Sequence, residues 1–278
     1  MVNFRNDQAA GLRRIMATPK PRVVSVISAS PIDQSRMMIN LAASIRAEGN
    51  EVLVVHASKN TRESSYEVEK TPALLEVAKA TASLTVAIKY TKQEFATTKL
   101  LPKDQVDSVL NDDLAQSLNN LFDELMQQYD MVLVDATLNN DDLLPLKTLN
   151  ECDIVIQLSR KPESIKYAYA LIKRICSQLG RRTFGIIVDD ANDAQAEIVF
   201  TNIAQVAKRF MQIELEFFGA IPADIHLSRA AKLGRPVIDA FPLTPASNAF
   251  KLIAQRLNSK NTRLTDINSN ALNTTIMV

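Results

Sequence analysis

The sequence predicts an α/β protein with a doubly wound, mostly parallel sheet flanked by helices, forming a three-layer sandwich. Two observations predict this class. Strand-like runs alternate with amphipathic helical patterns along most of the 278 residues. The strand-like runs are almost continuously apolar, which is typical of parallel strands buried on both faces. The length fits one large domain or two smaller ones, and a hydrophobic content of 46% is enough for a sizeable core.

The individual elements follow from the spacing of apolar residues. Strands rich in Val, Ile and Leu are expected at 22–28, 51–57, 131–136, 153–159, 183–190 and 215–222, with a weaker one near 95–101. Helical spacing predicts helices at 34–48, 112–128, 163–179, 193–210 and 245–257. Thr71 and Pro72 predict one more helix start, with the threonine as cap and the proline in the first position.

The two ends of the chain differ from this alternating region. Residues 1–20 precede the first strand, and the stretch "TPKPR" is typical of a semi-rigid linker. Residues 259–278 are polar, which predicts a flexible tail. We therefore expect an N-terminal segment at 1–20, an α/β domain at 21–258 and a C-terminal tail at 259–278.

The composition argues against several functions. With 32 Lys and Arg against 31 Asp and Glu, the chain lacks the basic surplus of a general nucleic-acid binder. Cys152 and Cys176 stand in apolar patterns, which predicts buried thiols in a reducing compartment. His56 and His226 stand apart from other ligand residues, so we expect no metal site. Neither a leader sequence nor an apolar run of about 20 residues is evident, which predicts a cytoplasmic protein.

The loop after the first strand has the frame of a phosphate-binding loop but not its residues. It joins a buried strand to a helix, yet residues 29–35 contain neither glycine nor lysine. Pro31 removes a backbone N–H, and Asp33 places a negative charge where phosphates would bind. Ser30 and Ser35 could donate hydrogen bonds but supply no positive charge. The loop is therefore either a simple strand-to-helix turn capped by Asp33 or a nucleotide site of unusual composition.

Several blocks resemble the MinD/ParA family of deviant-Walker ATPases, which have a P-loop NTPase fold. They are "NLAASIRAEGNEVLVVHAS" (40–58), "YDMVLVDATLNND" (129–141), "CDIVIQLSRKPESIKYAYALIKRI" (152–175) and "FFGAIPADIHLSRAAKLGRPVIDAFPLTPASNAF" (217–250). Within this family, the stretch "DQAAGLRRI" at 7–15 is similar to the N-terminal motif of the FlhG/FleN group, which regulates flagellar number and placement. The resemblance covers most of the chain and implies a role in flagellar biosynthesis and cell motility.

The resemblance also shows what has changed in the nucleotide site. The family's KGGxGK[ST] loop, the Walker A motif, is replaced by "SASPIDQS", with Ser35 at the place of the hydroxyl that binds Mg²⁺. His56 and Ser58 stand where the family has a D-x-D pair, and Asn139 replaces a glycine. The Walker B aspartate remains as Asp135. The degenerate site thus comprises Ser30, Asp33, Gln34, Ser35, His56, Ser58 and Asp135. We expect a pseudo-ATPase with no catalytic residue beyond the residual Asp135, and neither ATP nor Mg²⁺ unless the loop is still competent. Simpler roles are also open, with Asp135 as a turn cap and His56 as a strand-end residue.

The N-terminal motif implies a partner. In the FlhG/FleN group this segment forms a short helix that binds the GTPase FlhF and stimulates its GTP hydrolysis. The resemblance assigns this role to Asp7, Gln8, Leu12, Arg13 and Arg14. A glutamine can orient an attacking water, which makes Gln8 the candidate for stimulation, with Leu12 as the anchor. The alternative is an amphipathic arm that packs on its own domain.

The C-terminal helical pattern allows two interpretations. Phe250, Ile253 and Leu257 share one face of the segment 247–264, which could lie on a membrane or pack into the core. We expect core packing, with weak or indirect membrane contact at the cell pole or inner membrane.

Three functions follow from these patterns. The first is an FlhG-like pseudo-ATPase that acts on FlhF. The second is a noncanonical MinD-type ATPase with ATP-dependent dimerisation and membrane association. The third is a non-enzymatic ParA-like scaffold for another partner, such as a flagellar transcription regulator or switch-complex protein. Without the loop lysine that reaches across the family's dimer, we expect a monomer or a dimer independent of nucleotide.

Overall fold

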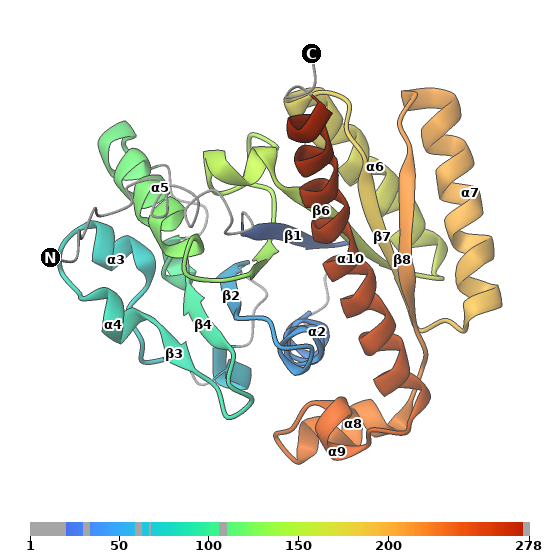
Figure 1. Cartoon of the computed structure of the whole chain (residues 1–278), viewed down its shortest axis with the longest axis horizontal. Helices are drawn as coiled ribbons and strands as arrows, with labels where there is room; N and C mark the ends of the chain where they lie inside the picture. The colour runs from blue at the N-terminus through green and yellow to red at the C-terminus, as the bar shows by residue number, and fades with distance from the viewer. Residues whose placement is uncertain (1–20, 30–33, 59–62, 67, 106–109, 275–278) are drawn as a thin grey trace, which may run out of the picture.

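The computed structural model describes residues 21–29, 34–58, 63–66, 68–105 and 110–274, with side chains to residue 259 except those of Ser64 and Tyr66. Its centre is an eight-stranded sheet in the order β3-β4-β2-β5-β1-β6-β7-β8 (Figure 1). Neighbouring strands are parallel except for β3 and β4. The predicted three-layer α/β fold is therefore confirmed.

The strands agree closely with the sequence. They are β1 Arg22–Ser28, β2 Val52–Ala57, β3 Lys89–Tyr90, β4 Ala96–Lys99, β5 Met131–Ala136, β6 Asp153–Ser159, β7 Phe184–Asp189 and β8 Leu215–Ile221. The six strong runs are confirmed to within one residue at either end, because β-branched runs buried on both faces mark their own limits. The weaker run near 95–101 forms β4, while the two-residue β3 is too short to leave a periodic signal.

The helices are α2 Ser35–Ala47, α3 Leu74–Ala78, α4 Leu84–Ala87, α5 Asp112–Met126, α6 Pro162–Leu179, α7 Asp193–Met211, α8 Ile225–Lys232, α9 Val237–Ala240 and α10 Pro245–Thr274. The predicted helix start at Thr71 and Pro72 is wrong by two residues. The helix begins after Ala73, whose backbone N–H donates to the Glu76 carboxylate at 2.7 Å, while Thr71 donates its hydroxyl to the Val68 carbonyl. A carboxylate in the first turn satisfies an otherwise unpaired N–H, so Glu76 sets the start.

Each face of the sheet carries its own core. One core is formed with α3, α5, α6 and α7, and the other with α2, α8, α9 and α10. Phe250, Ile253 and Leu257 of α10 are each 1% exposed and belong to the second core. This confirms the core-packing interpretation of that helix. The helical backbone of α10 continues to Thr274, into the segment for which the sequence predicts a tail, because an established helix gains one hydrogen bond per added residue.

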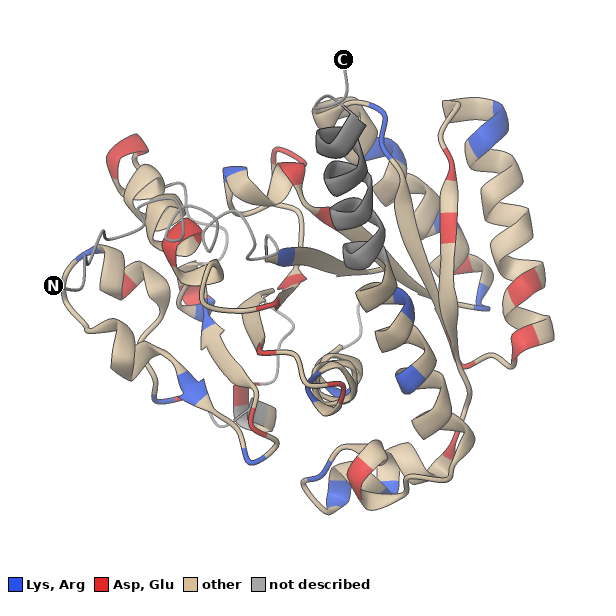
Figure 2. Cartoon of the chain, viewed as in Figure 1, with Lys and Arg blue, Asp and Glu red and all other residues tan. Residues whose placement is uncertain are grey.

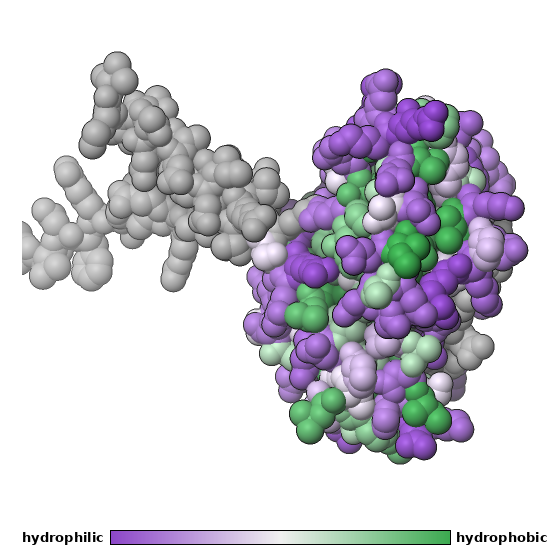
Figure 3. Space-filling model, turned by 90° about the vertical axis from the view of Figure 1, so that its right-hand side faces the viewer, coloured by the Kyte–Doolittle hydropathy of each residue, from purple (hydrophilic) through white to green (hydrophobic). Residues whose placement is uncertain are grey.

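Charges on the described residues are mixed in sign. In the view of Figure 2, basic and acidic segments are interspersed over helices and loops, as the near-zero net charge leads one to expect. Figure 3 shows the face at the β8 edge of the sheet, where apolar residues are scattered among hydrophilic ones. Arg256 of α10 donates to the Phe218 carbonyl of β8 at 3.0 Å, which occupies one acceptor of this edge strand. None of the described helices is both long and apolar enough to cross a bilayer.

Candidate functional site

The described residues of the degenerate site lie at the carboxyl ends of β1, β2 and β5, beside the start of α2. Open parallel α/β sheets bind their ligands at this edge. The strand register places His56 next to Asp135 and Asp135 next to Val26. Residues in register on parallel strands point to the same face, so both side chains face the layer that contains α2. Residues 30–33 lie outside the described part of the chain, and with them the predicted roles of Ser30 and Asp33.

Gln34 connects the loop to the sheet. It is the residue before α2, but its side chain makes no capping hydrogen bond and turns inward instead. Its amide Nε2 donates to Asp135 Oδ1 at 2.6 Å and to the Val26 carbonyl at 3.2 Å. Gln34 is 5% exposed and Asp135 is 0% exposed. The amide therefore satisfies a carboxylate that has been removed from water, where a missing donor would be costly.

The network continues across β2 to β4. His56 Nδ1 lies 3.9 Å from Asp135 Oδ2, and His56 Nε2 is hydrogen-bonded to Thr97 Oγ1 at 2.9 Å. Both His56 and Thr97 are buried. The sequence prediction did not include Thr97, although the adjacent Thr97 and Thr98 in an otherwise weak strand were a visible signal. The four side chains form a buried polar chain rather than a nucleophile and base facing a cleft.

The structure also places Ser35, Ser58 and Asn139, the other altered positions that it describes. Ser35 and Ser58 are both buried, the first directly after Gln34 in the chain and the second two residues after His56. The Asn139 side chain accepts hydrogen bonds from the N–H groups of Asp141 and Leu143, each at 2.9 Å, and so closes the turn after β5. The five N-terminal residues assigned to FlhF binding, Asp7, Gln8, Leu12, Arg13 and Arg14, lie outside the described residues.

The cysteines and the metal prediction concern other parts of the domain. Cys152 and Cys176 are free, but both are half-buried, whereas the sequence predicted buried thiols. Cys152 directly precedes β6, and Cys176 lies in the C-terminal part of α6. Burial raises the pKa of the Cys152 thiol to about 12, which favours the neutral thiol over the nucleophilic thiolate at neutral pH. Within the part of the chain that the structure describes, no three His, Cys, Asp or Glu residues are grouped to hold a metal ion.

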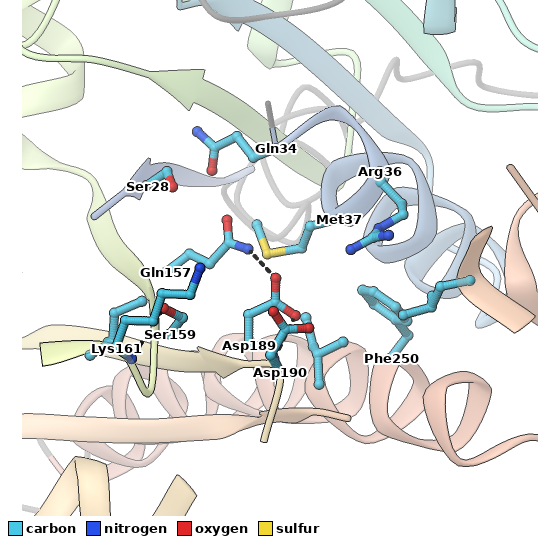
Figure 4. A pocket seen from close by; sticks show the side chains of 13 residues that line it. Ser28, Gln34, Arg36, Met37, Gln157, Ser159, Lys161, Asp189, Asp190 and Phe250 are labelled. Carbon is cyan, nitrogen blue, oxygen red and sulfur yellow. Dashed lines mark hydrogen bonds between the residues drawn. The ribbon is translucent and has the colours of Figure 1, made fainter. Parts of the chain in front are cut away.

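A small pocket lies beside the buried network, at the ends of β6 and β7 (Figure 4). Gln157 of β6 donates through Nε2 to Asp189 Oδ2 of β7 at 3.1 Å. Burial and the neighbouring Asp190 charge raise the pKa of Asp189. The space open to the centres of water molecules is about 50 Å³, enough for a few heavy atoms. The sequence prediction missed this pocket, although a glutamine inside one apolar strand and an aspartate pair ending the next were visible signals.

Comparison with known proteins identifies the fold. No protein-family model matches the sequence. The antiactivator FleN of Pseudomonas aeruginosa is 30% identical over 139 residues, which is 50% of this chain and 50% of FleN. The chain spans about half the length of the curated relatives that it matches. The MinD cell division protein of Aquifex aeolicus superposes with a TM-score of 0.62 at 18% identity, covering 86% of this chain and 97% of that protein. The chain has the MinD/ParA fold.

A second solved structure extends the comparison. MinD of Pyrococcus horikoshii, in complex with Mg-ADP, gives a TM-score of 0.64 at 16% identity, with coverage of 85% and 96%. The MinD/ParA and FlhG/FleN resemblance predicted from the sequence is thus confirmed as a MinD/ParA fold with sequence similarity to FleN. The two MinD structures resemble the chain in fold, whereas FleN resembles it in sequence.

The residues of this MinD/ParA fold do not fit magnesium-bound ATP well. By motif order, Gln34 directly precedes Ser35 and so occupies the place of the Walker A lysine. It offers a neutral amide that is already bonded to Asp135. The Ser35 residue itself is 1% exposed. We therefore derive no reaction step through a nucleotide.

Proposed function

We propose that this chain is an FlhG-like regulator of flagellar number or placement whose own nucleotide site does not hydrolyse ATP. In this proposal it acts by binding, and its target is an FlhF-like GTPase that it engages through residues 7–14. The similarity to the antiactivator FleN supports a regulatory role at the level of the family. The resemblance of "DQAAGLRRI" to the FlhG/FleN motif supports the choice of partner.

The hydrogen bond between Gln34 and Asp135 carries the proposal that the site is inactive. In the MinD/ParA resemblance, Asp135 is the Walker B aspartate, which helps to hold Mg²⁺, and the residue at position 34 is a lysine that balances phosphate charge. Here the amide of Gln34 occupies Asp135 Oδ1 at 2.6 Å inside the protein. A glutamine in place of this lysine therefore removes the positive charge and gives Asp135 a hydrogen-bond partner inside the protein. To bind a hydrated Mg²⁺ ion, the buried carboxylate would have to give up this hydrogen bond, which is unfavourable.

Nucleotide binding tests this part of the proposal. Isothermal calorimetry of the full chain with ATP or ADP and Mg²⁺ is expected to show no binding at millimolar nucleotide. An intact-loop protein of the MinD/ParA fold serves as the positive control. Micromolar binding would overturn the proposal and favour the alternative, a noncanonical ATPase of MinD type. Light scattering with and without Mg-ATP tests the expected lack of a nucleotide-driven dimer in the same samples.

FlhF turnover tests the second part. GTP hydrolysis by FlhF from the same organism is measured alone, with the full chain and with a peptide of residues 1–20. We expect stimulation by both, loss of stimulation with Gln8→Ala, and weaker binding with Leu12→Ala, because a glutamine can orient the attacking water. Asn3→Ala, upstream of the motif, is the matched control. If neither the chain nor the peptide stimulates FlhF, the scaffold alternative with another partner takes its place.

A further inference from the structure

The pocket beside the buried network is rich in hydrogen-bond acceptors. Its lining includes Gln34 from the loop, Ser28 from β1, Gln157 from β6, and Asp189 and Asp190 from the end of β7. These residues come from segments far apart in the sequence and meet because β1, β6 and β7 are adjacent in the sheet. The pocket therefore depends on the fold and is not part of any local motif.

Two amide oxygens in this pocket lack a donor. Gln34 is 5% exposed and Gln157 is 9% exposed, and the Oε1 atoms of both are buried without a hydrogen-bond partner among the described residues. In Figure 4 the amide oxygens of Gln34 and Gln157 point toward each other. A buried amide oxygen without a donor costs about 1–3 kcal/mol, so two that face each other indicate a missing donor.

The orientation of both amides is fixed by chemistry. Nε2 of Gln34 donates to a carboxylate and a carbonyl, which accept hydrogen bonds only. Nε2 of Gln157 donates to Asp189 Oδ2. Rotating either amide by half a turn would put an oxygen against these acceptors and create repulsion. The oxygens are therefore held toward the pocket.

The interior of the pocket favours a cation over an anion. Gln34 and Gln157 present two amide oxygens there, and Asp189 and Asp190 are adjacent carboxylates at the rim, where burial and the Asp190 charge raise the pKa of Asp189. Arg36 and Lys161 also line the pocket, and like Asp190 they are exposed, so water screens the rim charges of both signs. A phosphate would meet the two interior oxygens, which accept hydrogen bonds and offer no donor. A group with several N–H donors and a positive charge would complement them.

We propose that this pocket binds the ammonium or guanidinium head of a small organic cation, with Gln34 and Gln157 as the interior acceptors and Asp189 and Asp190 at the rim. A space of about 50 Å³ matches a head group of a few heavy atoms. The same chemistry can be supplied by a free amine or by a basic side chain of a protein. This inference goes beyond the proposed regulation of FlhF and does not depend on it.

Calorimetry with the full chain tests the proposal. The probes are agmatine, putrescine and N-acetyl-arginine amide, each at constant ionic strength, with 1,4-butanediol as the neutral counterpart of putrescine. We expect saturable 1:1 binding of the cations and none of the diol. Gln157→Leu is expected to weaken binding at least about tenfold, because it removes one interior acceptor of a charged donor. Gln128→Leu, at an exposed turn before β5, is the matched control.

The outcomes separate the sources and the alternatives. Binding of agmatine alone supports a free amine, and binding of the blocked arginine alone supports a protein side chain. Equal binding of cations and diol, equal binding by wild type and Gln157→Leu, or no binding of any cation would overturn the proposal. Displacement of a bound organic cation by potassium ions at equal concentration would also overturn it. Should Gln157→Leu fold poorly, Gln157→Met, which keeps the length of the side chain without a strong acceptor, takes its place with the same expected loss of binding. None of these results bears on FlhF turnover, so the two proposals fail independently.

Discussion

Gln34 and Gln157 are both buried at the carboxyl edge of the same sheet, and the amide oxygen of each lacks a donor, but their Nε2 atoms bond to carboxylates in different surroundings. The amide of Gln34 donates to a carboxylate with no exposure to water, and that network continues through His56 to Thr97. The amide of Gln157 donates to Asp189, which is partly exposed. The same residue type therefore holds a fully buried carboxylate on one side of β1 and a partly exposed one on the other.

Replacing Gln34 should produce the largest effect. Gln34→Leu removes a donor from the buried Asp135 carboxylate, and we expect the free energy of unfolding at pH 7 to fall by about 2–4 kcal/mol. Urea unfolding followed by circular dichroism measures this. Gln34→Leu combined with Asp135→Asn should recover part of the loss, since the uncompensated charge is then gone. A loss of under about 0.5 kcal/mol in the single variant would show that the hydrogen bond between Gln34 and Asp135 does not stabilise the fold.

The far end of the same network should respond less. Thr97→Val removes the hydroxyl bonded to His56 Nε2 while keeping the shape of the side chain. We expect a loss of about 1–2 kcal/mol, because a buried ring nitrogen loses its partner. Thr201→Val, on the exposed side of α7, provides the control and should change the unfolding free energy by no more than about 0.5 kcal/mol. Similar losses in both variants would contradict a network that reaches β4.

The matched substitution at Gln157 should be almost neutral. Gln157→Leu and Gln34→Leu both remove a buried amide oxygen that has no donor, but Gln157→Leu deletes a hydrogen bond to a partly exposed carboxylate. Water can replace that bond, so we expect a change in unfolding free energy of under about 1 kcal/mol. Chemical unfolding beside Gln34→Leu in the same buffer makes the comparison direct. Equal losses from the two glutamines would contradict this dependence on the exposure of the carboxylate.

The smallest effect concerns pH. Because the pKa of Asp189 is raised in the folded protein, its charged form disfavours folding, and this penalty is present above the folded pKa. Asp189→Asn should therefore be slightly more stable than wild type at pH 7, by less than about 1 kcal/mol given its partial exposure. The advantage should vanish as pH falls below the unfolded value of about 3.9, where the wild-type carboxyl is protonated in both states. Stability curves from pH 3 to pH 7 test this, and an advantage that grows on acidification would reverse the assigned sign.

The sequence by itself determined the fold class and most strand limits. Runs such as "MVLVDA" are apolar at all positions but one, so burial on both faces defined the strand without reference to its neighbours. Long helices such as α6 and α7 followed from apolar spacing over many turns. The start of α3 did not follow, because the Glu76 carboxylate that caps it competes with an equally plausible threonine and proline two residues earlier. The alterations of the phosphate loop could also be read from residue identities alone.

Only the tertiary structure decided what the altered residues do. Gln34 and Asp135 are 101 positions apart, and their contact exists because β1 and β5 pair in one particular register. Gln157 and Asp189 meet for the same reason across β6 and β7. Hydrogen bonds between distant side chains depend on distances of a few tenths of an ångström, which no local pattern of hydrophobicity encodes. Periodicity therefore specifies the sheet, whereas register specifies which carboxylate each buried amide bonds to and where its unpaired oxygen points.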